Sequence, residues 1–186
     1  MYADNTLTPK EATRLCALGT LAAGPMRYGA LANAIRQFLG HISGPSLDLM
    51  GPSIELLKFE GLVTPLEGEG MEDDALLAVT EDGMDALRTL LKAPVRSSST
   101  DLNMLIITLK FRFLHLLPPP DQRDQIHLLA DASETEMERL IALRRQHARE
   151  PGYLTHWLDH DISELESRLT WLQEMERILE SAPDPA

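Results

Sequence analysis

The chain has 186 residues, with 17 Lys and Arg against 29 Asp and Glu, which gives a formal net charge of −12. Neither half has a positive balance, so the composition argues against non-specific polyanion binding, which usually needs a basic face. The single cysteine, Cys16, excludes an intrachain disulfide, and no apolar run is long enough to span a bilayer.

The first residues of the chain and its single cysteine indicate the compartment and the role of Cys16. The first six residues lack a basic and an apolar region, so we expect no signal peptide. A lone cysteine fits a reducing compartment, and we expect a cytoplasmic protein. Because no base or cation is evident beside it in the sequence, we expect Cys16 to pack as a small buried hydrophobe rather than a reactive thiol.

A capping box predicts the first helix, over residues 8–23. Thr8 suits the N-cap, Pro9 the first helical position and Glu11 the third. Leucines at helical spacing form its apolar stripe, and Gly24 follows its end.

Two further helices follow, over residues 28–39 and 45–61. In the second of these, Ile54 and Leu57 fall on one face, with Phe59 near it. Gly61 comes directly after the last periodic residues and can take the left-handed conformation that ends a helix.

A hairpin and a fourth helix complete the first domain. Strands are predicted at residues 62–66 and 75–79, joined by a loop at 67–74 that holds five carboxylates. Thr80 then suits the N-cap of a helix that runs to Ala93. Three helices, a two-stranded wing and a helix are typical of a winged helix-turn-helix domain over residues 1–93.

The remainder is predicted to be entirely helical. Serines and a proline mark residues 94–100 as a linker. Helices follow over 101–117, over 121–149 as one helix or two bent near Ser133, and over 153–181. The fold class is therefore α+β and mostly α, with a winged helix-turn-helix domain followed by an all-α antiparallel helical dimerisation domain at residues 101–186.

The last helix carries apolar residues at steps of three and four, the spacing of a helix packed along its length on other helices. A small helical tail can hardly bury such a seam alone, so we expect a homodimer. The candidate dimerisation residues are Leu158, Ile162, Leu165, Leu169, Trp171 and Leu172. Trp157 and Trp171 face nearly the same side of this helix. They are expected to anchor the dimer interface or, alternatively, to line an apolar effector pocket.

Four stretches together resemble the PadR-like transcriptional regulators, especially the AphA-like branch with a long helical C-terminal domain. They are Leu18–Met26, Pro52–Val63, Val79–Leu87 and Glu164–Glu174, in that order along most of the chain. The resemblance implies a dimeric regulator that binds double-stranded DNA, and because no apolar run could span a bilayer we expect no membrane contact. The resemblance leaves open whether a small molecule or a protein acts as an effector.

The DNA contacts that this resemblance implies rest on few residues. The candidates are Arg27, Arg36, Ser53 and Lys58. The positions where the family often has a tyrosine and basic residues are Gly51, Glu55 and Leu56, and the wing is acidic rather than basic. The alternative is therefore a degenerate winged helix that binds a protein through its acidic wing and has weak or no affinity for DNA.

Two other patterns also have a simpler explanation. His156 and His160 stand four apart with Glu164 one turn further, a spacing that can hold a metal, but we favour a solvated helical face. The basic and aromatic alternation at residues 110–115 superficially suits single-stranded nucleic acid, but core packing fits a helix better. We find no catalytic motif and expect no enzyme activity, cofactor or metal.

Overall fold

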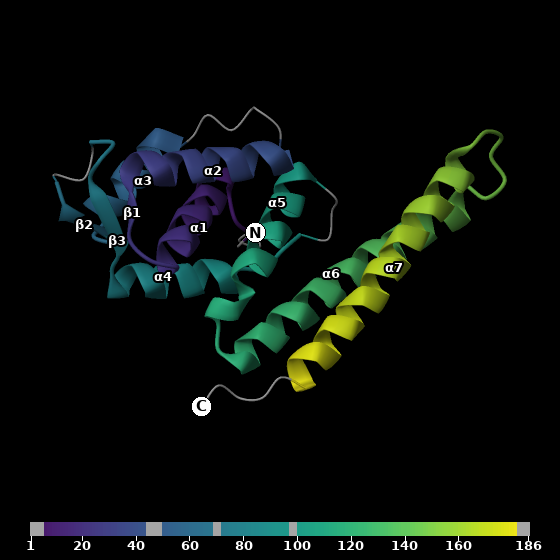
Figure 1. Ribbon diagram of the computed structural model, residues 1–186. Helices are drawn as coiled ribbons and strands as arrows, with labels where there is room; N and C mark the ends of the chain where they lie inside the picture. Colours follow the sequence, from purple (N-terminus) through teal and green to yellow (C-terminus); the bar gives the residue numbers. More distant parts are fainter. Residues whose placement is uncertain (1–5, 44–49, 69–71, 97–99, 182–186) are drawn as a thin grey trace, which may run out of the picture. The chain divides into compact units, whose positions relative to one another are not determined.

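The computed structural model describes residues 6–43, 50–68, 72–96 and 100–181, which divide into two compact units. The first holds α1 (Pro9–Ala22), β1 (Met26–Arg27), α2 (Tyr28–Ser43), α3 (Met50–Phe59), β2 (Val63–Glu67), β3 (Leu76–Val79), α4 (Glu81–Lys92), α5 (Asp101–Phe113) and a 3-10 turn η1 (Leu114–Leu116). The second holds α6 (Pro119–Gln146) and α7 (Leu154–Ser181). Three helices, a small sheet and a following helix give the first unit the winged-helix fold (Figure 1).

Helix α1 is the centre of the first unit. It contacts α2, α3, α4, α5 and β3, and nearly all of its residues from Ala12 to Leu21 are buried. The predicted capping box begins the helix, because the hydroxyl of Thr8 accepts from the backbone N–H of Glu11 while the Glu11 carboxylate accepts from the N–H of Thr8 at 2.8 Å. Cys16 is fully buried here, as expected from the sequence.

The sheet has three strands in the order β1-β3-β2, all antiparallel. The sequence predicts β2 and β3 but not β1, in which Met26 pairs with Leu77 and Arg27 with Leu76. A strand of two residues is too short to show an alternating pattern, so only its partner in the fold defines it.

The end of α3 is closed by Gly61, as predicted. Its φ of +76° lies in the left-handed region, and its N–H donates to the carbonyl of Lys58 at 3.0 Å. The N–H of Leu62 donates to the carbonyl of Leu57 at 2.9 Å, which completes a Schellman motif. Ile54 and Leu57 are buried, but Phe59 is 89% exposed and does not share their face.

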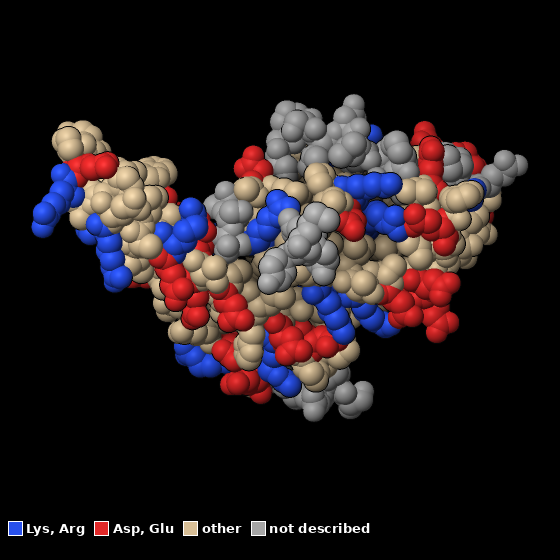
Figure 2. Space-filling model, turned by 180° about the vertical axis from the view of Figure 1, so that it is seen from behind, with Lys and Arg blue, Asp and Glu red and all other residues tan. Residues whose placement is uncertain are grey.

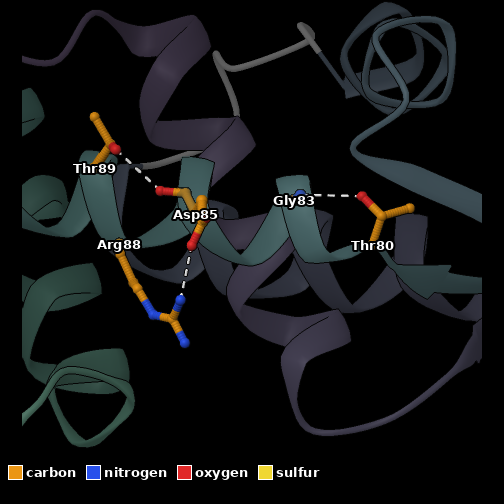
Figure 3. A network of polar contacts seen from close by, with 5 residues as sticks. All are labelled: Thr80, Gly83, Asp85, Arg88 and Thr89. Carbon is orange, nitrogen blue, oxygen red and sulfur yellow. Dashed lines mark hydrogen bonds and ion pairs between the residues drawn. The ribbon is translucent and has the colours of Figure 1, made fainter.

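Thr80 joins the end of α3 to the start of α4. Its hydroxyl donates to the carbonyl of Gly61 at 2.8 Å and accepts from the N–H of Gly83 at 3.0 Å, which makes it the predicted N-cap (Figure 3). A Cβ on Gly83 would lie 2.1 Å from the carbonyl oxygen of Leu62, so only glycine permits this approach. These contacts fix α3, the wing and α4 to one another.

Helix α5 packs differently from the expectation. Its sequence suggests a place in the C-terminal domain, but it contacts α1 and α2, and the first unit extends through Leu117. Its N-cap is Thr100, because the Thr100 hydroxyl accepts from the N–H of Asn103 at 3.1 Å. A helical apolar stripe shows that a helix is packed, but it does not show against which partner.

The second unit is a pair of long helices, α6 and α7, that contact each other along their lengths (Figure 1). Helix α6 is continuous through Ser133, which settles the choice between one helix and two. Leu140, Leu158 and Leu165 form a buried cluster between them. Of the described helices, none has the length and apolar character needed to cross a membrane.

Candidate nucleic-acid interface

The wing is tied to the start of α2. The N–H groups of Tyr28 and Gly29 donate to the carbonyls of Ala75 at 2.9 Å and Asp73 at 3.0 Å. These are orphan donors of the first helical turn, which would otherwise need water or a ligand. The start of α2 therefore holds the wing rather than presenting these two donors to a phosphate.

Arg27, the first candidate, is engaged by the wing. It is exposed at the end of β1, where its guanidinium donates to the backbone carbonyl of Asp74. Its Nη2 also lies 3.7 Å from a carboxylate oxygen of Glu67. The positive charge is thus partly balanced by the wing, although the side chain stays half exposed.

The other candidates lie on α2 and α3. Arg36 is exposed in the middle of α2, where its guanidinium donates to the side-chain oxygen of Asn33 at 2.8 Å. Lys58 is half-buried in the last turn of α3. Ser53 lies within α3, but its side chain is outside the described part of the structure. Arg36 is therefore an exposed cation whose hydrogen-bond partner is a neutral amide rather than a carboxylate.

An ion pair that the sequence reasoning did not identify sets the position of α3. The guanidinium of Arg14 in α1 makes two hydrogen bonds to the carboxylate of Glu60, which follows α3, one of them 3.0 Å long. Such bidentate pairs fix both partners in one plane. Arg14 therefore positions α3, and its charge is balanced within the unit by the carboxylate of Glu60.

The surface around the wing is acidic. Figure 2 shows Asp and Glu side chains gathered at the end of the first unit that carries the wing and the start of α4. The exposed carboxylates there are Glu67, Asp73, Asp74, Glu81 and Asp82. Within a Debye length of about 8 Å, these charges would repel a phosphate backbone.

The predicted dimerisation residues divide into two groups. Leu158, Leu165 and Leu172 are buried within the chain, and Ile162 packs beside the cluster that joins α6 and α7. The apolar seam is thus covered by α6 of the same chain, which corrects the expectation that a second copy covers it. Leu169 is half-buried, whereas Trp171 is 47% exposed.

The histidines of α7 are not grouped as their spacing suggested. His160, Asp161 and Glu164 bring their ligand atoms within 4.8 Å of one another. His156 is not part of this group, and its ring lies 6.3 Å from that of Tyr153. The group thus contains Asp161 in place of His156.

The basic and aromatic run in α5 is used for packing. Lys110 is 1% exposed, and its ammonium group donates to the carbonyl of Leu91 near the end of α4. The guanidinium of Arg112 lies 4.2 Å from the centre of the Phe38 ring. These contacts place the run inside the first unit, as the core-packing interpretation predicts.

Comparison with known proteins gives one family match and several distant structures. Residues 2–176 match the family described as "Putative AphA-like transcriptional regulator". The crystal structure of smu.1604c from Streptococcus mutans UA159 is 18% identical, with a TM-score of 0.38 over 87% of this chain and 96% of that chain. Bacillus subtilis PadR is 15% identical, with a TM-score of 0.40 over 95% of this chain and 99% of that chain. No curated protein gives a significant match.

Proposed function

The chain belongs to the AphA-like family of transcriptional regulators, and from this premise we propose that it is a homodimeric DNA-binding regulator of the cytoplasm. The observation that carries the proposal is the way α3 is held. The Arg14–Glu60 pair fixes it to α1, and the Gly61 stop and Thr80 fix its end to the wing and α4. A helix so rigidly held in the recognition position is suited to enter a major groove.

The cations that would contact DNA lie on α2 and α3. Arg36 and Lys58 are the candidates for phosphate or base contacts, and Ser53 adds a hydroxyl in α3. Arg27 would contact a phosphate only by leaving the carboxylate of Glu67. With so few cations we expect a shallow salt dependence, because each neutralised phosphate steepens the slope of log K against log salt by about one.

The exposed apolar residues of α7 support the homodimer. Trp157, Trp171 and Ile178 stand at intervals of fourteen and seven residues and are each about half exposed. Positions seven apart share one face of a helix, so these residues form an apolar row on the face that α6 leaves open. A row with two tryptophans is expected to pair with a second copy.

Binding to genomic fragments in a gel-shift assay tests the DNA-binding function. We expect retained fragments at low salt and a loss of affinity in Arg36→Ala, which removes a phosphate contact and lowers the salt slope by about one. Arg177→Ala in α7 is the matched control, because it removes the same charge outside the winged helix, where Arg177 pairs with Glu174.

The acidic wing favours a second candidate function, a winged helix that binds a protein. The exposed carboxylates around the wing and the engagement of Arg27 by Glu67 both weaken contact with DNA. Under this alternative, no genomic fragment is retained at low salt, and Arg36→Ala and Arg177→Ala behave alike. Retention of a fragment by the wild type together with loss in Arg36→Ala would exclude it.

A further inference from the structure

Polar residues interrupt the exposed apolar row of α7. Trp157 and Trp171 lie fourteen residues apart, and the position midway between them is Glu164, which shares their face. Two turns of this face therefore carry charge where the neighbouring turns carry exposed tryptophan. A partner surface that covers the tryptophans also has to accommodate this charge.

The charge is concentrated in a compact group of metal-ligating atoms. The ligand atoms of His160, Asp161 and Glu164 all lie within 4.8 Å of one another, and His160 Nε2 is 3.5 Å from Glu164 Oε1. One helix supplies all three residues, so its backbone already holds them together. This removes much of the ordering cost that a site built from separate segments would have.

The neighbouring ionisable residues are used elsewhere. The carboxylate of Asp159 accepts two hydrogen bonds from Arg144 in α6, one of them 3.1 Å long. His156 and His160 each lie near an aromatic ring, of Tyr153 at 6.3 Å and of Trp157 at 6.0 Å, but only His160 belongs to the group of ligand atoms within 4.8 Å of one another. The three grouped residues are therefore distinguished from the acidic and histidine residues around them by geometry, and not by composition alone.

We propose that His160, Asp161 and Glu164 bind a divalent transition-metal ion, with Zn²⁺ as the best match. Imidazole nitrogen and carboxylate oxygen are both zinc ligands, and three protein ligands leave a fourth position open. Ligand atoms around a tetrahedral zinc ion lie about 3.4 Å apart, so small rotations of these exposed side chains close the group around the ion.

Occupation of this site also favours self-association through α7. The ion neutralises two carboxylates in the middle of the apolar row, which lowers the cost of covering the row with a second copy. This part of the inference rests on the proposed homodimer. Metal binding by His160, Asp161 and Glu164 does not depend on the homodimer.

Calorimetric titration of Zn²⁺ into untagged, full-length protein tests the metal site. We expect one ion per chain, and a metal affinity at least about tenfold weaker in His160→Ala and in Glu164→Gln. Mutation of residues that only hydrogen-bond to a metal ligand already weakens metal affinity about tenfold, so the loss of a ligand should cost no less. His156→Ala is the control and keeps wild-type affinity. Circular dichroism checks that each variant keeps its helices. Absence of zinc binding by the wild type, or equal loss in His156→Ala, overturns the site.

Sedimentation of the same proteins with and without Zn²⁺ tests the second step. We expect Zn²⁺ to shift the wild type toward the dimer and to leave Glu164→Gln unchanged. Zinc binding that does not change the dimer fraction overturns the coupling but not the site. A gel shift on metal-free protein reports DNA binding separately, so failure of the DNA-binding function is distinguishable from failure of the metal site.

Discussion

The backbone of Gly19 in α1 lies directly against the ring of Phe113 at the end of α5. A Cβ on Gly19 would lie 2.6 Å from two carbons of that ring, closer than any side chain permits. Phe113 is itself buried, so the ring has little room to move. This contact is one of the reasons why α5 belongs to the winged-helix unit rather than to the pair of helices that follows it.

Replacing Gly19 by valine should destabilise the protein by about 1–3 kcal/mol, the usual cost of overpacking a core. Gly40→Ala in α2 is the matched control, because nothing lies within 4 Å of a Cβ at that position. There the substitution should stabilise by about 0.5–1 kcal/mol through helix propensity. Urea denaturation measures both, and a Gly19→Val variant as stable as the wild type would contradict the contact.

Replacing Thr80 by alanine should cost about 1 kcal/mol of stability, because α4 loses its N-cap. The hydrogen bond to the carbonyl of Gly61 is lost as well, so the end of α3 is loosened. Thr89→Ala in the same helix is the control, since that exposed hydroxyl only donates to the carbonyl of Asp85 (Figure 3). Its effect should stay within about 0.5 kcal/mol. Equal losses in the two variants would contradict the capping role.

Lys110 should make the stability of the protein depend on pH. Burial lowers the pKa of its ammonium group from 10.5 to about 8. Between these two values the unfolded chain binds more protons than the folded chain at this residue, so the free energy of unfolding rises with pH. The contribution of Lys110 is therefore unfavourable below pH 8 and is relieved as the pH rises toward 10.5.

The variant Lys110→Met isolates this effect, because it keeps an apolar side chain of similar length and removes the charge. The wild type should gain stability relative to the variant as the pH rises from 8, by at most about 1.4 kcal/mol per pH unit. Urea denaturation of both proteins between pH 7 and pH 10 measures the difference. If the stability difference between the two proteins stayed constant over this pH range, burial would not lower the pKa of Lys110.

Neutralising the wing should strengthen DNA binding. In Glu67→Gln the guanidinium of Arg27 loses the carboxylate 3.7 Å away and becomes free to approach a phosphate. The affinity should rise about twofold to threefold at low salt, because a charge about 8 Å from a phosphate interacts with it by about 0.5 kcal/mol in water. Glu174→Gln in α7 controls for net charge. If the two variants bind equally, the wing does not approach DNA.

Replacing Trp171 by alanine should weaken self-association by about 2 kcal/mol or more, as expected for a tryptophan at the centre of an interface. Met104→Ala, which also removes an exposed apolar side chain but lies in α5, should have little effect. Sedimentation equilibrium at several protein concentrations measures both dimer constants. A monomeric wild type at all concentrations would exclude the homodimer.

The features that the sequence alone determined are those whose partners lie within a few residues. Thr8 and Glu11 complete their capping box inside one helical turn, and Gly61 ends α3 through bonds to Lys58 and Leu57. Such contacts are fixed by local spacing and by the conformations that each residue type allows. The order of helices, hairpin and helix followed from them, and with it the winged-helix fold.

Only the tertiary structure decided which surfaces meet. The stripe containing Leu158 and Leu165 predicted a buried face, but α6 of the same chain covers it, and the exposed row with Trp171 lies elsewhere on α7. The sequence likewise placed Arg27 among the DNA contacts without showing that the wing holds it. The chemistry of a side chain determines which kind of partner it can pack or pair with. The fold of the whole chain determines which residue lies beside it.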